Sequence, residues 1–124
     1  MFETMHYVMV TVSDMKKSID FYQNKLGIPL KIESPEWTEF LTQGTTLALH
    51  GGGVKKTKTP EDAKCAGVCT FGFSVSNLNQ VYEDLKSKGV MFVMPPTQRE
   101  GEGIKLAVAI DPDGLAISFA EMVK

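Results

Sequence analysis

The apolar and polar positions of this chain follow the same order twice. A short apolar run leads to a capping residue, then to apolar side chains every three or four residues, then to a glycine. The cap is Ser13 or Asp14 and the glycine Gly27 in the first half; they are Asn77 and Gly89 in the second. Ser, Asp and Asn favour helix N-caps, and Gly favours the position after a helix. The sequence therefore predicts two copies of one supersecondary unit.

Runs of β-branched and aromatic residues predict four strands in each half. We expect Pro95-Pro96 to end the second strand of the second half, and Asp111-Pro112-Asp113-Gly114 to form a β-turn before the last one. The predicted strands are Tyr7–Val12, Leu30–Glu33, Trp37–Thr42 and Thr45–His50, followed by Val68–Val75, Val90–Met94, Ile104–Ile110 and Leu115–Glu121. With one helix after the first strand, each half has the order βαβββ, and the fold class is α+β.

The predicted organisation is a single domain over residues 1–124 made of two modules. The first module covers about 1–52 and the second about 67–124, with a linker over about 53–66. We interpret the glycine triplet Gly51-Gly52-Gly53 as flexible linker, because no helical pattern opens after it.

The composition is 43% hydrophobic and 23% charged over 124 residues, as in one globular domain. The net charge of −2 gives no reason to expect nucleic acid or an acidic membrane as a partner. The N-terminus has no Lys or Arg ahead of its apolar run, unlike a secretory signal, and no run approaches the ~18 residues of a membrane span. We expect a cytoplasmic protein in which Cys65 and Cys69 are reduced.

Several motifs carry a family resemblance. They include His6-Tyr7-Val8, Thr11-Val12-Ser13-Asp14, Leu47-Ala48-Leu49-His50 and, most diagnostic, Asp111-Pro112-Asp113-Gly114. In these the chain resembles the vicinal oxygen chelate superfamily, which includes glyoxalase I, extradiol dioxygenases, and fosfomycin- and bleomycin-resistance proteins. The resemblance implies two βαβββ modules, each a curved sheet with its helix on the convex side, around a ligand cavity. It also implies a homodimer.

The metal-using members of this family place ligands at positions that correspond here to Tyr7, Ala48, Thr70 and Ser118. Transition metals in proteins are held mainly by imidazole, carboxylate and thiolate groups, so we expect no metal and no cofactor. A slip of one residue would bring in His6, but such a slip reverses the face of a strand, and His6 is expected to point away.

Strand alternation identifies the side chains that would face the cavity. Trp37 and Glu39 share a strand face and could hold a cationic or aromatic ligand, or that face could simply be amphipathic. We expect Cys69 in the core and Glu121 to be exposed, and we assign no catalytic residue, because no nucleophile–base pair is apparent. The predicted ligand contacts are Tyr7, Met9, Trp37, Glu39, Ala48, His50, Thr70 and Ser118.

The hypothesis that these residues favour is a metal-independent protein that binds a small aromatic or amphipathic molecule, as in sequestration or resistance. One alternative is a metal-dependent lyase, isomerase or dioxygenase of the glyoxalase type, or catalysis by His50 and Glu39 as acid and base. Another is a non-catalytic interaction module. Whether the protein is an enzyme stays open, although the residues favour binding.

Overall fold

The computed structural model describes residues 1–54, 66–67, 69–99, 101 and 103–123. The chain divides into two compact units, Met1–Lys56 and Thr57–Lys124, which we describe separately. Most of the predicted linker over 53–66, together with Cys65, lies outside the described residues. None of the helices in the described ranges is long and apolar enough to cross a membrane.

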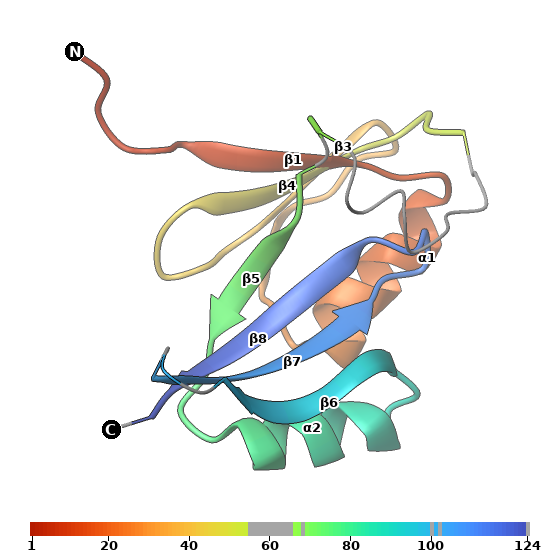
Figure 1. The fold of residues 1–124 in the computed structure, drawn as a ribbon. Helices are drawn as coiled ribbons and strands as arrows, with labels where there is room; N and C mark the ends of the chain where they lie inside the picture. Colours follow the sequence, from red (N-terminus) through yellow and green to blue (C-terminus); the bar gives the residue numbers. More distant parts are fainter. Residues whose placement is uncertain (55–65, 68, 100, 102, 124) are drawn as a thin grey trace. The chain divides into compact units, whose positions relative to one another are not determined.

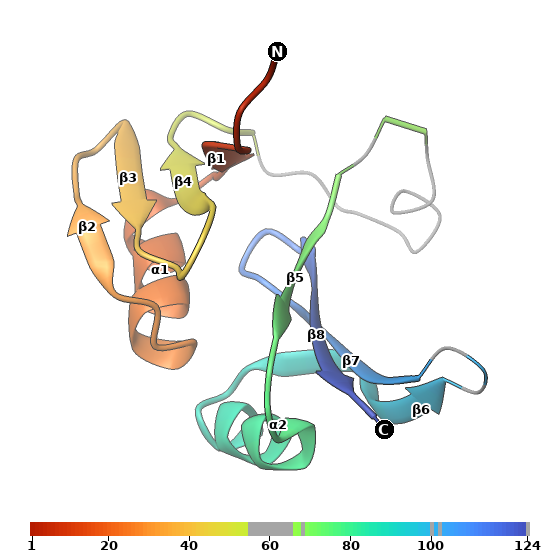
Figure 2. The ribbon, with the colours of Figure 1, turned by 90° about the vertical axis from the view of Figure 1, so that its left-hand side faces the viewer.

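The first unit is a four-stranded sheet with one helical segment against it (Figures 1 and 2). The strand order is β1-β4-β3-β2, in which β1 and β4 are parallel and the other pairs antiparallel. The elements are β1 (Tyr7–Thr11), α1 (Met15–Ile19), the π-helical segment η1 (Asp20–Lys25), β2 (Leu30–Ile32), β3 (Trp37–Phe40) and β4 (Thr46–His50).

The second unit repeats this topology. Its strand order is β5-β8-β7-β6, with β5 parallel to β8, and α2 packs against β6, β7 and β8 (Figure 2). The elements are β5 (Phe71–Ser74), α2 (Leu78–Ser87), β6 (Met91–Arg99), β7 (Ile104–Ile110) and β8 (Ala116–Met122). The predicted α+β class and the repeated βαβββ order are therefore confirmed.

The predicted helix caps are confirmed as well. The side chain of Asp14 accepts a hydrogen bond from the backbone N–H of Lys17 at 3.2 Å, and that of Asn77 accepts one from Gln80 at 3.1 Å. The glycine after each helix has a left-handed φ, 79° at Gly27 and a similar value in the second unit. Each helix thus begins and ends where local sequence chemistry favours it.

The first helix differs from the regular helix that the apolar spacing predicts. After one α-helical turn it widens, and the N–H of Leu26 donates to the carbonyl of Phe21, five residues back, at 2.9 Å. The wider turn buries the adjacent side chains of Phe21 and Tyr22 together, and their rings meet edge to face at 5.0 Å. Tyr22 also contacts Phe40 on the sheet at 5.9 Å, which places the helical segment against that face.

Strand β6 corrects the prediction that Pro95-Pro96 ends it at Met94. The strand continues through both prolines to Arg99. Proline cannot donate to a strand ladder, but β6 is the edge of its sheet, and its register with β7 shifts between Met94 and Thr97. An edge strand with an irregularity tolerates the missing donors.

The glycine triplet after β4 is bonded to its own unit, which corrects its interpretation as flexible linker. The N–H of Gly51 donates to the carbonyl of Glu36 at 3.0 Å, and that of Gly53 donates to the carbonyl of Val12 at 3.0 Å. A Cβ at Gly53 would lie 2.9 Å from the Val12 carbonyl oxygen, too close for any real Cβ atom. Glycine is therefore needed where the chain passes the end of β1.

Two further sequence predictions are wrong. Cys69 is exposed rather than in the core, because it precedes β5 instead of lying within it. Glu121 is half-buried rather than exposed, and its Oε1 accepts a hydrogen bond from the N–H of Leu78 at 2.6 Å. A carboxylate from β8 thereby satisfies a free donor at the start of α2 and complements the helix dipole.

The turn at Asp111 is as predicted, with its Oδ1 accepting from the N–H groups of Asp113 and Leu115.

We predict that Gly53→Ala lowers the free energy of unfolding by about 1–3 kcal/mol, because the new methyl group overlaps the backbone of β1. Gly44→Ala is the matched control, since a Cβ there meets nothing within 4 Å; it should be neutral or slightly stabilising. Urea denaturation of both variants measures the difference. Equal midpoints would show that the close approach at Gly53 does not exist.

We also predict that Glu121→Ala destabilises the protein by about 1–2 kcal/mol, because α2 loses an N-terminal hydrogen-bond acceptor. Glu121→Gln keeps an acceptor oxygen, so it should destabilise the protein less than Glu121→Ala does. Glu83→Ala, at an exposed position on the same helix, is the control. Thermal unfolding by circular dichroism measures all three; an effect of Glu121→Ala no larger than that of Glu83→Ala would contradict the capping role.

Candidate functional site

One face of the first sheet gathers six of the eight predicted ligand contacts. Residues paired across neighbouring strands point to the same face, and the pairing forms rows across β1, β4 and β3. Met9, Ala48 and Glu39 form one row, and Thr11, His50 and Trp37 form the next. Tyr7 is paired with Thr46 in the row on the other side of Ala48. We call the side chains of Tyr7, Met9, Trp37, Glu39, Ala48 and His50 the aromatic face.

The opposite face of the same sheet is the core of the unit. Phe40 and Leu49 are fully buried, and Phe40 contacts Tyr22 of the helical segment. On the aromatic face, by contrast, Tyr7 and Met9 keep 48% and 46% of their surface exposed. The alternation predicted for β1 is therefore present, and it leaves the large apolar side chains of Tyr7 and Met9 partly exposed.

Three rings of the aromatic face form a chain of edge-to-face contacts. The ring centroids of Tyr7 and Trp37 are 5.7 Å apart, and those of Trp37 and His50 are 6.3 Å apart. Since the rows of Tyr7 and Trp37 lie on either side of the row of Ala48, these rings lean toward each other over it. Ala48 is accordingly 0% exposed although it points to the open face. Such edge-to-face pairs hold the rings in a defined geometry.

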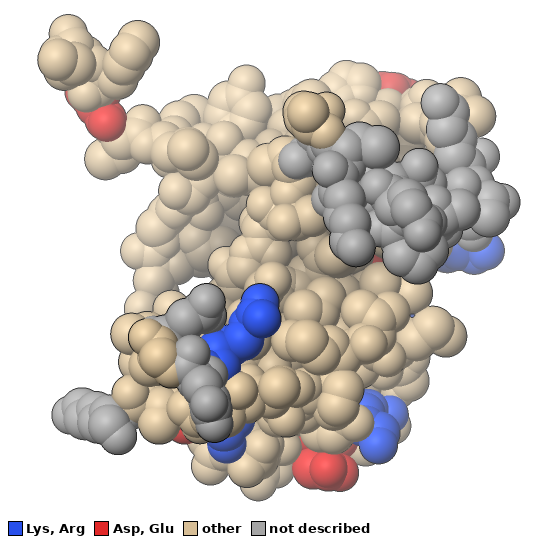
Figure 3. Space-filling view, in the orientation of Figure 1, with Lys and Arg blue, Asp and Glu red and all other residues tan. Residues whose placement is uncertain are grey.

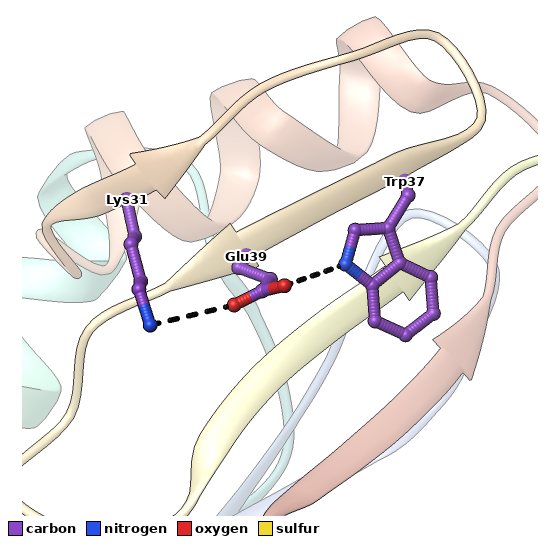
Figure 4. Close-up of polar contacts among 3 residues, drawn as sticks. All are labelled: Lys31, Trp37 and Glu39. Carbon is purple, nitrogen blue, oxygen red and sulfur yellow. Dashed lines mark hydrogen bonds and ion pairs between the residues drawn. The ribbon is translucent and has the colours of Figure 1, made fainter.

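Glu39 is held by its neighbours (Figure 4). Its Oε2 accepts a hydrogen bond from the indole Nε1 of Trp37 at 2.8 Å, and its Oε1 lies 3.6 Å from Nζ of Lys31. Each carboxylate oxygen thus has a partner, and the indole is fixed in orientation. The ion pair itself adds little stability because the Lys31 side chain is 44% exposed.

His50 is exposed at the end of β4, and its ring is anchored through one nitrogen. Nδ1 lies 2.6 Å from the carbonyl oxygen of Gly51. The backbone N–H of Gly51 donates to the carbonyl of Glu36, which fixes the peptide unit just before this carbonyl.

Sequence reasoning missed Lys31 and Gly51 as neighbours of this face. The pairing of β2 with β3 could have indicated Lys31, because it sets a lysine beside the strand that carries Glu39. The contact between His50 and Gly51 joins adjacent residues, but it depends on the backbone conformation after β4, which the residue types did not indicate.

The other two predicted contacts lie in the second unit. Ser118 is half-buried on β8 and is paired with Gly72 and Val108. A Cβ at Gly72 would lie 3.0 Å from the Cβ of Ser118, so glycine lets β5 approach β8 here. Thr70 is exposed just before β5. Neither side chain belongs to the aromatic face.

The four positions that metal-using relatives fill do not fit a transition metal. Tyr7 is packed against Trp37, Ala48 has no donor atom, and Thr70 and Ser118 offer neutral hydroxyls. In the part of the chain that the structure describes, no group of three or more His, Cys, Asp and Glu side chains could hold a metal ion.

Among the described residues visible in Figure 3, the Lys, Arg, Asp and Glu side chains lie in small separate groups, and most of the remaining described surface in that view is uncharged.

Sequence comparison now identifies the family. The profile of the Glyoxalase/Bleomycin resistance protein/Dioxygenase superfamily matches residues 4–119. The chain belongs to this superfamily. The resemblance seen in the sequence motifs is therefore confirmed, and so are the two βαβββ modules that it implied.

Individual members of the superfamily are only distantly similar. The chain is 27% identical to metallothiol transferase FosB of Lysinibacillus sphaericus, over 94% of this chain and 81% of that protein. It is 24% identical to the bleomycin resistance protein of Geobacillus stearothermophilus, over 91% and 92%. The crystal structure of SMU.1112c has a TM-score of 0.83 at 22% identity, covering 98% of this chain and all of that one. At this identity the structural likeness supports the fold alone.

We predict that Glu39→Ala changes the fluorescence of Trp37 and lowers the free energy of unfolding by about 1–2 kcal/mol, because the half-buried indole N–H loses its acceptor. Trp37 is the sole tryptophan, so the emission spectrum reports on this site alone. Glu39→Gln should lower the free energy of unfolding by less than Glu39→Ala, since it keeps an acceptor for the indole and removes only the exposed ion pair.

The control for this prediction is Glu33→Ala, at an exposed position beyond β2. It should leave both the spectrum and the denaturation midpoint near those of the wild type. Identical behaviour of the Glu39→Ala and Glu33→Ala variants would show that the carboxylate does not hold the indole.

Proposed function

We propose that this protein binds and sequesters a small aromatic or amphipathic molecule without a metal, in the manner of a resistance protein. The observation that supports this most directly is the aromatic face, an exposed and ordered set of rings with few polar groups. We propose Tyr7, Met9, Trp37, Glu39 and His50 of the aromatic face as its ligand contacts.

The energetics of the aromatic face favour binding. Tyr7 and Trp37 are large apolar side chains with few rotatable bonds, so they lose little entropy when a ligand covers them. Their edge-to-face contact and the hydrogen bond from Trp37 to Glu39 fix them before any ligand arrives. A pre-ordered, mostly apolar surface with a few polar groups is typical of small-molecule sites.

The residues support metal-dependent chemistry less well. Lewis-acid catalysis requires side chains that hold the ion, and Tyr7, Ala48, Thr70 and Ser118 do not fit that role. Acid–base catalysis by His50 and Glu39 is also weakly supported, because both carboxylate oxygens of Glu39 already have partners. The similarity to a metallothiol transferase nevertheless makes metal dependence the alternative that the experiment must test.

We propose that the protein acts in the cytoplasm as a homodimer. We propose that its modules cover residues 1–52 and 67–124, joined by the segment between them.

The test uses metal-free bleomycin as the probe, since a relative bears the name bleomycin resistance protein. Titration in the presence of a chelator should change the fluorescence of Trp37 and release heat in a calorimeter. Tyr7→Ala should weaken binding by about 3- to 10-fold through the loss of one aromatic contact. Val93→Ala, at a 61% exposed position in the second unit, is the control and should bind like the wild type.

Metal analysis of the purified protein decides between the two functions. The protein should contain far less than one metal ion per chain after exposure to Ni, Zn, Fe and Mn, and binding should not depend on the chelator. Stoichiometric metal, or binding that the chelator abolishes, would refute the proposal and favour the glyoxalase-type enzyme. No binding by any variant would refute a bleomycin-type ligand.

A further inference from the structure

The anchored ring of His50 has a defined tautomer. A carbonyl oxygen can only accept a hydrogen bond, so the short contact between Nδ1 of His50 and the oxygen of Gly51 requires the proton on Nδ1. In a neutral imidazole the other nitrogen, Nε2, then carries a lone pair and can only accept. Nε2 has no partner among the residues that the structure describes, and the side chain is exposed.

The tautomer is maintained by backbone packing as well as by the hydrogen bond itself. Gly51 is buried, and its N–H donates to Glu36 at 3.0 Å. A Cβ at this position would lie 2.8 Å from the carbonyl oxygen of Pro35, so no larger residue fits without a shift. The Cα of Gly51, from which the carbonyl extends toward His50, is therefore held close to neighbouring segments.

The remaining polar groups of this face discriminate less between ligands. The hydroxyls of Tyr7, Thr11 and Thr46 can donate or accept, and so suit either kind of ligand group. The indole N–H of Trp37 is used by Glu39, and each carboxylate oxygen of Glu39 has a partner. In the neutral imidazole, Nε2 of His50 is thus an exposed group of the aromatic face that can only accept a hydrogen bond.

From this we infer that His50 selects ligands that carry an N–H or O–H donor at the edge of an aromatic ring. The inference rests on the proposed binding function and specifies its ligand class. His50 contacts Trp37 edge to face, so a ring that covers Tyr7 and Trp37 brings its own edge toward the imidazole. A donor there replaces the water that solvates Nε2, whereas a ligand without one leaves a covered acceptor unpaired.

The experiment compares two probes that differ in one donor, 2-naphthol and 2-methoxynaphthalene. Binding is measured by the shift of the indole N–H resonance of Trp37, which is the single tryptophan signal of the ¹⁵N-labelled protein. We expect 2-naphthol to bind about 3- to 10-fold more tightly, which is the range of one hydrogen bond.

Variants of His50 test whether it causes this preference. His50→Phe keeps a ring but has no acceptor, and should bind the two probes equally. His50→Gln places an amide oxygen near the position of Nε2 and should keep part of the preference. His6→Gln changes the other histidine, which also contacts Tyr7, and should leave the preference unchanged.

A second measurement examines the tautomer without any ligand. Under alkaline conditions in which imidazole is neutral, the ¹⁵N shifts of the His50 ring should show the proton on Nδ1. A proton on Nε2 would overturn the inference. So would equal binding of the probes by the wild type, or a preference that survives His50→Phe, and either result would leave the proposed function standing. Failure of both probes to bind would refute the aromatic-ligand function together with the inference.

Discussion

The simultaneous pairing of β4 with β1 and β3 is the constraint on which the first unit depends. It sets the rows that place Met9 and Glu39 beside Ala48, with the rings of Tyr7 and Trp37 on either side. The same network continues past the strand ends into the glycine triplet. Because a shift of one residue would turn every side chain of β4 to the other face, this register determines both the core and the aromatic face.

The aromatic face places side chains on the superfamily fold that differ from those of metal-using relatives. Where metal-using relatives place ligands, this unit has a tyrosine in edge-to-face contact with Trp37 and an alanine that the rings cover. The polar groups that remain are positioned by hydrogen bonds: Glu39 by Trp37 and Lys31, and His50 by Gly51. Such preorganisation suits selective binding, since the cost of ordering is met during folding.

The sequence by itself determined the features that depend on neighbouring residues. Asp14 and Asn77 cap their helices through side-chain bonds three residues away, and Gly27 ends the first helix because few other residues adopt a positive φ easily. The α+β class and the alternation of β1 follow from apolar periodicity, which is also local. The superfamily could be predicted for the same reason, since its motifs are short and contiguous.

Only the tertiary structure decided the features that depend on distant partners. Pro95-Pro96 stays within β6 because that strand is an edge, and Glu121 caps α2 from a strand 43 residues away. In the candidate site, strand parity correctly gave the face of Trp37 but not its hydrogen bond to Glu39, nor the contact of the His50 ring with the Gly51 carbonyl. Both contacts join residues one or two positions apart, but their geometry depends on sheet register and on the close backbone packing after β4, which no local pattern encodes.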